Sequence, residues 1–438
     1  MPQAAERQPP APEDKESAQP SWLKQLGPGL ITGAADDDPS GIATYSQSGA
    51  QFGFNLLWTV LLTYPLMVGI QAISARIGRV SGHGLATNIR RHYSRSLLFG
   101  IVASLLVANT INIAADVAAM GEAVALLLPG PAHWYAAAFG LISVVLQVWI
   151  PYQRYVRVLK WLTLALLAYV VSALSLSLPW LNILHAMALP HLSMDSPYIT
   201  TVVAVFGTTI SPYLFFWQAS QEVEELRADP AAQPLKRAIS QARHHLGRIT
   251  VDTRIGMAFS NLVAMFIMVV SAATAGLHGV AQIESAAQAA SALRPVAGDF
   301  AFTIFAAGII GTGLLAVPVL AGSAAYAMAG AFGWRDSLEL RYGEAKKFYL
   351  IIIAATVLGT ALCFTRFDPM QALYWSAVIN GVVALPIMVV VMRLASNGAV
   401  MGRLRVTRSL AFWGWLCTAV MAAAVVSMFW TMYIGHNC

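Results

Sequence analysis

The segment 36–41 reads Asp-Asp-Asp-Pro-Ser-Gly inside an otherwise apolar stretch. Carboxylates within hydrocarbon are costly unless they are paired or hydrated, so they mark functional sites. Pro39 removes a backbone donor and Gly41 permits unusual dihedral angles, so we expect a helix to be broken here. Unwound backbone leaves carbonyl oxygens beside the carboxylates, and hard divalent cations prefer such oxygen ligands. Alternatively, the acids lie at a helix end in interfacial water and act only as caps.

A second break is predicted in the segment 205–213, which reads Val-Phe-Gly-Thr-Thr-Ile-Ser-Pro-Tyr. Here too a glycine precedes hydroxyl residues and a proline within an apolar span. Taken alone, the segment would indicate an ordinary proline kink. Its pairing with the aspartate break favours a functional interpretation.

Five predicted helices separate the two breaks, and an odd number of helices per repeat reverses the orientation of the second repeat. Residues 26–178 and 198–394 are therefore predicted to form inverted repeats whose broken first helices meet near the bilayer midplane. The predicted substrate site combines groups from both breaks: Asp38, the carbonyl groups near Ala35, Thr208 and Ser211.

Two further spans carry polar side chains. Asn109, Asn112 and Asp116 are spaced by three and four residues, so they line one helix face. This stripe suits a water-lined route or groups surrounding the cation, and equally a hydrogen-bonded seam between helices. Asn380 lies in the middle of the span 370–394 and is a weaker candidate for the permeation path.

The composition indicates that membrane-spanning helices position these residues. Charged residues make up 11% of the 438 residues, hydrophobic residues make up 57%, and the mean hydropathy is +0.62. A soluble protein averages about 25% charged residues. The chain is therefore predicted to be an all-α polytopic membrane protein, with a disordered cytoplasmic tail at 1–22 and a transmembrane domain at 23–434.

Eleven segments are long enough to cross ~30 Å of hydrocarbon. They are 26–48, 54–75, 97–128, 133–151, 158–178, 198–220, 255–275, 298–332, 348–364, 370–394 and 410–434.

The Lys and Arg residues orient these spans. All but Arg294 and Arg366 fall on the side of the N-terminus, which is therefore expected to be cytoplasmic, with the C-terminus outside. We expect the basic residues to fringe the anionic inner leaflet of the cell membrane instead of gathering in one patch. A nucleic-acid partner is accordingly not expected.

Enzymatic motifs are missing from the sequence. It contains neither a His-Glu-x-x-His zinc motif nor a GxxxxGK[ST] phosphate loop. Asp38 and Asp116 could supply the two carboxylates of an intramembrane protease, but no dyad motif accompanies them. We predict no enzymatic activity, no cofactor and no obligate protein partner.

The order of these features resembles the Nramp divalent-metal transporters over residues 24–434. The family's helix 1 signature Asp-Pro-Gly-Asn stands as Asp-Pro-Ser-Gly at 38–41, and its helix 6 motif Gly-Ala-Thr-Val-Met-Pro-His stands as Gly-Thr-Thr-Ile-Ser-Pro-Tyr at 207–213. The Leu-Pro of helix 10 recurs at 385–386. The resemblance implies a leucine-transporter-type fold of five plus five helices, with helices 1 and 6 broken, that works by alternating access.

By this resemblance Asp38 is the anionic metal ligand, and Ala35 and Thr208 contribute carbonyl oxygens. Gly41 stands where the family has an Asn ligand, and Ser211 stands where it has a Met thioether. Thioethers favour thiophilic transition metals, whereas oxygen ligands favour Mg²⁺, Ca²⁺ or Mn²⁺. Losing two bulky ligands also enlarges the site, which suits an ion that keeps several waters. The pattern therefore resembles the Nramp-related magnesium transporters.

The residues linked to proton movement also differ. Tyr213 replaces the family's helix 6 histidine, and Asp116 matches the first helix 3 acid while Ala119 replaces its partner. We therefore predict import of Mg²⁺ and Mn²⁺ without proton coupling, with Asp36 and Asp37 as outer attractors or as acceptors for metal-bound water. The alternatives are a proton-coupled Mn²⁺/Fe²⁺ importer, an amino-acid carrier of the same fold, a membrane hydrolase, and a metal sensor that does not transport.

Overall fold

The computed structural model describes residues 28–150, 154, 163–229, 231–274, 283, 285–365 and 368–437. Over these residues the chain is helical and contains no strand, as predicted for an all-α membrane protein. The predicted tail at 1–22 lies outside the described residues.

The first half of the chain contains the aspartate segment, between α1 (Pro28–Asp36) and α2 (Pro39–Phe52). Its other helices are α3 (Leu57–Ser81), α4 (Leu85–His92), α5 (Arg95–Ala125), α6 (Ala132–Trp149), α8 (Leu167–Ser175) and α9 (Trp180–Ala188), with short 3-10 turns at Gly53–Leu56 and Thr163–Leu166.

The second half begins with the other broken helix. Its helices are α10 (Ser196–Thr209), α11 (Pro212–Ala228), α12 (Ala242–Thr274), α13 (Ala286–Ser291), α14 (Arg294–Ala297), α15 (Ala301–Phe332), α16 (Lys346–Leu362), α17 (Pro369–Ser396), α18 (Gly398–Met401) and α19 (Arg408–Asn437), with 3-10 turns at Ile239–Gln241 and Gly298–Phe300.

Both predicted helix breaks are confirmed. Asp37 and Asp38 separate α1 from α2, and Ile210 and Ser211 separate α10 from α11. A proline follows each break at the first position of the new helix, where its fixed φ is favourable and its missing N–H has no intrahelical partner to lose. Local sequence therefore explains why two helices are interrupted inside the bundle.

Membrane crossings are harder to count. Among the described residues, eight helical stretches are long and apolar enough to cross a bilayer, or nine if Leu164–Ser175 and Trp180–Ala188, which meet at 116°, form one crossing. Residues 39–81 count there as one stretch, although the chain turns at Gly53 with φ 58°. The 17-residue α16 is shorter than the roughly 20 residues of a typical crossing. Helices occupy each of the eleven predicted ranges, but the number of crossings stays a prediction.

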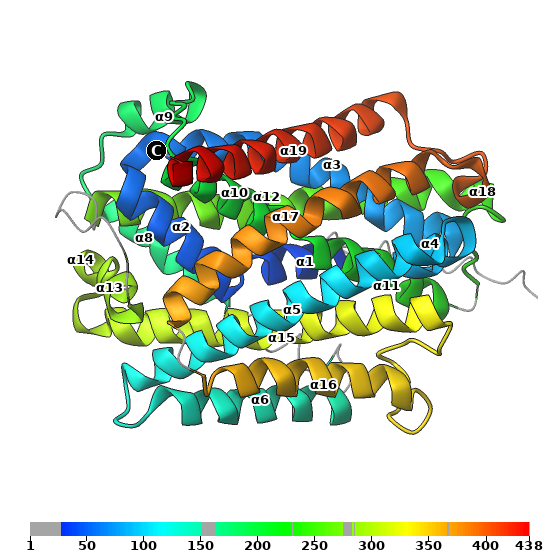
Figure 1. Cartoon of the computed structure of the whole chain (residues 1–438), viewed down its shortest axis with the longest axis horizontal. Helices are drawn as coiled ribbons and strands as arrows, with labels where there is room; N and C mark the ends of the chain where they lie inside the picture. Colours follow the sequence, from blue (N-terminus) through cyan, green and yellow to red (C-terminus); the bar gives the residue numbers. More distant parts are fainter. Residues whose placement is uncertain are drawn as a thin grey trace, which may run out of the picture.

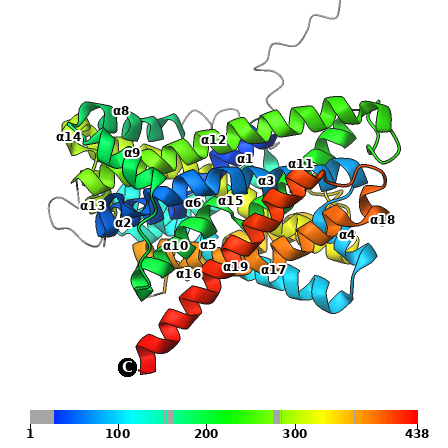
Figure 2. The same ribbon diagram turned by 90° about the horizontal axis from the view of Figure 1, so that it is seen from above.

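The broken helix of each half of the chain packs against a helix of the other half. α1 and α2 both pack against α12, while α11 packs against α3 and α15. At one edge of the bundle α6 and α16 lie side by side, next to α5 and α15 (Figure 1). This exchange of partners is expected when each broken helix packs on the second helix of an inverted repeat. α19 crosses the bundle diagonally, and its C-terminal end projects away from the other helices (Figure 2).

Glycines set the closest helix crossings. A side chain at Gly33 of α1 would collide with the backbone of Gly256 in α12, and one at Gly207 of α10 would collide with the backbones of Ala377 and Gly381 in α17. Small residues of this kind allow membrane helices to approach closely. They hold both broken helices against their neighbours.

Candidate metal-binding site

Asp38 lies at the break between α1 and α2 and is 1% exposed. Its Oδ1 atom accepts hydrogen bonds from Ser40 Oγ (2.6 Å) and from the backbone N–H of Gly41 (2.8 Å), which caps α2. Its Oδ2 atom accepts from Asn112 Nδ2 (3.1 Å) on α5 and from the Tyr213 hydroxyl (3.3 Å) on α11. Three helices therefore position this carboxylate, and both of its oxygens are hydrogen-bonded.

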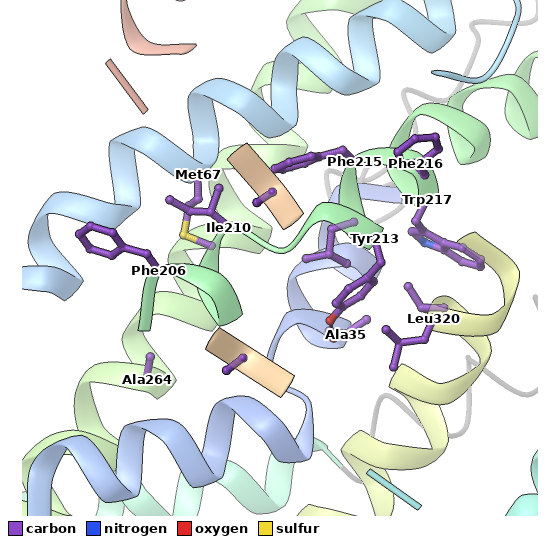
Figure 3. Packing of buried hydrophobic residues seen from close by; sticks show 14 of the residues in the cluster. Ala35, Met67, Phe206, Ile210, Tyr213, Phe215, Phe216, Trp217, Ala264 and Leu320 are labelled. Carbon is purple, nitrogen blue, oxygen red and sulfur yellow. Dashed lines mark hydrogen bonds between the residues drawn. The ribbon is translucent and has the colours of Figure 1, made fainter. Parts of the chain in front are cut away.

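Two contacts extend this network. The Tyr213 hydroxyl, which points toward Ala35 in Figure 3, also lies 3.2 Å from the carbonyl oxygen of that residue. Ser376 Oγ on α17 donates to Asn112 Oδ1 at 2.9 Å and thereby fixes the orientation of that amide. Sequence reasoning missed Ser376, although it stands four residues before Asn380, a spacing that places both on one helix face.

The second break brings Thr208 and Ser211 to the same region. Ser211 Oγ lies 2.9 Å from the carbonyl oxygen of Gly207 and 2.8 Å from that of Thr208, so its hydroxyl can donate to either carbonyl at the end of α10. A Cβ atom at Gly41 would lie 3.0 Å from Thr208 Oγ1. The missing side chain at Gly41 therefore lets the two broken helices approach each other.

Asp36 and Asp37 lie on the α12 side of the break. Ser260 Oγ of α12 lies 2.6 Å from Asp36 Oδ2 and 3.0 Å from Asp37 Oδ1. The remaining oxygen of each carboxylate has no hydrogen-bond partner among the described residues. Nothing in the sequence distinguishes Ser260 from other serines in apolar helices, so it could not have been found from the pattern.

The polar side chains of Asn109, Asn112 and Asp116 on α5 have different surroundings. Asn109 Nδ2 donates to α15, through the carbonyl of Leu320 (2.8 Å) and Ser323 Oγ (2.7 Å). It thus fits the interhelical seam, whereas Asn112 faces Asp38. Asp116 is fully buried, and over the described chain neither of its carboxylate oxygens has a hydrogen-bond partner of normal geometry.

Asn380 contributes a further buried polar group, from α17. It is 1% exposed, and neither polar atom of its side chain has a partner within the described part of the chain. A buried amide without a hydrogen-bond partner has a desolvation cost unless a water or an ion binds it.

The carboxylates of Asp36, Asp37, Asp38 and Asp116 form no ion pair with any basic side chain in the described residues. Carbonyl, carboxylate, amide and hydroxyl oxygens surround Asp38, and no group of three His, Cys, Asp or Glu side chains in the described ranges is arranged to chelate a metal. Buried carboxylate charge without a partner is strongly unfavourable. The site therefore suits a cation held by few protein oxygens and by water.

A comparison with known families agrees with this chemistry. Residues 29–431 match the Nramp family model, described as natural resistance-associated macrophage protein-like. The chain belongs to the Nramp family.

Individual relatives extend over nearly the whole chain. The divalent metal cation transporter MntH of Deinococcus radiodurans is 28% identical, covering 94% of this chain and 91% of the relative. MntH of Klebsiella pneumoniae strain 342 is 26% identical, with 92% of each chain covered.

Solved structures agree on the fold. A mutant form of a manganese transporter from Eremococcus coleocola matches with a TM-score of 0.72 at 19% identity, covering 93% of this chain and 87% of the other. Mhp1, a nucleobase-cation-symport-1 family transporter, matches with a TM-score of 0.53 at 14% identity, covering 94% and 93%. The predicted Nramp membership and the leucine-transporter-type fold are thus confirmed.

In this Nramp protein a cavity of about 700 Å³ lies beside α2 and the N-terminal part of α10. Ala43 and Gln47 of α2, Thr200 of α10 and Tyr374 of α17 contribute to its lining. Asp38 is not among the lining residues, so the cavity stops short of the proposed ligand.

On the opposite side of Asp38, α1 is fastened to two neighbouring helices. The backbone N–H of Gly29 donates to Asp252 Oδ2 (2.7 Å) on α12, and Thr32 Oγ1 donates to Gln218 Oε1 (2.5 Å) on α11. A cavity therefore lies on one side of Asp38, whereas interhelical hydrogen bonds hold α1 in place on the other side.

Proposed function

We propose that this Nramp protein carries hard divalent cations, Mg²⁺ and Mn²⁺, across the membrane by alternating access. The observation that carries the proposal is that the candidate ligand atoms at the buried Asp38, where both broken helices meet, are carboxylate, carbonyl and hydroxyl oxygens. The names of its relatives, divalent metal cation transporters, support the cation class.

The proposed ligands are the Asp38 carboxylate and the carbonyl oxygens of Ala35 and Thr208. Gly41 adds no side-chain ligand, and Ser211 supplies a hydroxyl instead of a thioether. Mg²⁺ dehydrates reluctantly and keeps several waters, so it needs few protein ligands. Asp36, Asp37, Asp116, Asn112, Tyr213 and Asn380 would bind metal-bound water or line the path.

The driving force that we propose is the membrane potential together with the concentration gradient. A divalent cation gains about 4.6 kcal/mol per 100 mV when it moves to the negative side. Tyr213 replaces a histidine, so the site lacks the side chain that titrates near neutral pH. This composition favours uptake without proton coupling.

We place the protein in the cell membrane with α1 starting on the cytoplasmic side. In this orientation the cavity beside Ala43 opens outward and α1 closes the cytoplasmic path. The repeats are 26–178 and 198–394, and α19 lies outside both. No enzymatic activity, cofactor or obligate protein partner is needed for this function.

The proposal is tested by substituting the central carboxylate. Asp38→Ala should abolish Mg²⁺ uptake into proteoliposomes, while Asp299→Ala, which removes an exposed carboxylate, should leave it unchanged. Both variants should elute as wild-type protein in size-exclusion chromatography. Wild-type flux through a folded Asp38→Ala protein would refute the proposal.

A proton-coupled Mn²⁺ carrier is the second candidate. The buried Asp116, without a hydrogen-bond partner of normal geometry in the described chain, favours it because such a carboxyl group could hold a proton. Proton influx that depends on Mn²⁺ at zero membrane potential would support this candidate over uncoupled uptake.

A further inference from the structure

A separate cavity of about 590 Å³ lies where α3 ends and α4 begins, and none of the proposed cation ligands lines it. Its size is that of a typical small-molecule site. Its lining is rich in basic side chains and includes no Asp or Glu from the described residues. The basic members are His83, Arg91, His92, Lys236 and Arg237. The sequence predicts basic residues dispersed along the membrane surface, but here five basic side chains gather around one cavity.

The two guanidinium groups in this cavity have unused donors. The side chains of Arg91 and Arg237 are exposed and form no hydrogen bond or ion pair with any described residue. Lys236 Nζ donates to the carbonyl of Ala399 across the cavity wall. A guanidinium fork matches the geometry of phosphate oxygens and binds them bidentately.

Backbone carbonyl groups orient the two histidines. His83 Nδ1 lies 2.8 Å from the carbonyl oxygen of Ser81, and His92 Nδ1 lies 2.9 Å from that of Asn88. A carbonyl only accepts, so each Nδ1 carries its proton, and each Nε2 has no hydrogen-bond partner among the described residues. Burial is the main cause that lowers the pKa of His83, and the positive charge of Arg91 lowers it further.

Hydrogen bonds between neighbouring segments hold the cavity walls in place. The backbone N–H groups of Leu235 and Lys236 donate to the carbonyls of Arg79 (3.2 Å) and Val80 (3.1 Å) at the end of α3. These bonds hold the segment between α11 and α12 against the end of α3. Asn88 is also hydrogen-bonded through its amide, to Ser81 Oγ and to the carbonyls of His83 and Gly84.

We propose that this cavity binds a phosphate-bearing anion between Arg91 and Arg237. Two kinds of ligand carry such a phosphate group: the headgroup of an anionic phospholipid and a soluble phosphate such as a nucleotide. Clustered basic side chains at the membrane surface recognise anionic headgroups in the same way.

The test measures binding to the purified full-length protein and needs no cation flux, so its outcome is independent of the proposed transport. One arm titrates ATP in metal-free buffer by calorimetry. The other counts phosphatidylglycerol molecules retained from mixed micelles by native mass spectrometry. Arg91→Ala/Arg237→Ala is compared with Arg243→Ala/Arg341→Ala, which removes two exposed arginines that do not line the cavity.

We expect wild-type protein to bind at least one probe, and the cavity variant to bind it at least tenfold more weakly. The control variant should stay within twofold of wild type. Binding of ATP without lipid assigns a soluble ligand, and retention of phosphatidylglycerol alone assigns a headgroup. The proposal is overturned if neither probe binds, or if the control variant loses as much affinity as the cavity variant.

Discussion

The hydroxyl of Tyr213 lies 3.3 Å from the carboxylate of Asp38, and 3.2 Å from the carbonyl oxygen of Ala35. It therefore contacts two of the three groups proposed to bind the cation. Since a hydroxyl carries a single hydrogen, it can donate to only one of them at a time. A cation bound by both oxygens would displace this donor.

Tyr213→Phe should consequently raise cation affinity. The change removes the competing hydroxyl and keeps the ring, which is fully buried. A hydrogen bond is worth about 0.5–1.5 kcal/mol net, so the KM for Mg²⁺ uptake should fall by roughly 2- to 12-fold. An increased KM would mean that the hydroxyl assists cation binding.

Two asparagines on one helix face should behave differently. Asn112→Ala removes a donor to Asp38 and should reduce the rate of uptake at least ~10-fold, since hydrogen bonds to charged groups contribute about 1.5–3 kcal/mol. Asn109→Ala breaks contacts with α15 only and should lower thermal stability more than the KM or rate of the folded carrier. Equal effects on uptake by both variants would contradict the assignment of Asn112 to the site.

Ser211 should determine which cations are preferred. Ser211→Met places a thioether beside the site, so Cd²⁺ uptake should increase relative to Mg²⁺ uptake by about tenfold, because soft sulfur ligands select thiophilic metals. Ser211→Ala serves as the control and should not increase the Cd²⁺ preference. If both variants shift the preference equally, the loss of the hydroxyl is the cause and ligand softness is not.

The contact between Gly29 and Asp252 should hold the packed side closed. Asp252→Ala removes the acceptor for the Gly29 N–H and should favour conformations in which α1 leaves α12. A cysteine introduced at Gln218 should then react faster with a thiol reagent applied from the N-terminal side of α1 than it does when Asp252 is retained. Unchanged labelling would show that other contacts close this side.

Local sequence was sufficient for the two helix breaks. Pro39 and Pro212 mark the starts of α2 and α11, and the spacing of Asn112 and Asp116 placed both on the face of α5 that serves the site. These features depend on neighbours in the chain, which periodicity and proline chemistry describe well.

Contacts between distant helices could not be derived in this way. Ser260 meets Asp36 and Asp37 only because α12 crosses α1 at two glycines, and the sequence does not encode this crossing in any local pattern. Likewise, Arg91 and Arg237 are far apart in the chain and line one cavity only because the α11–α12 connection pairs with the end of α3.

The most direct test of the hard-cation site is Mg²⁺ uptake into proteoliposomes that hold a Mg²⁺-sensitive dye, with Cd²⁺ as competitor. The oxygen-only site predicts Mg²⁺ uptake that Cd²⁺ blocks weakly. Strong Cd²⁺ transport without Mg²⁺ uptake would contradict it and would indicate a transition-metal carrier.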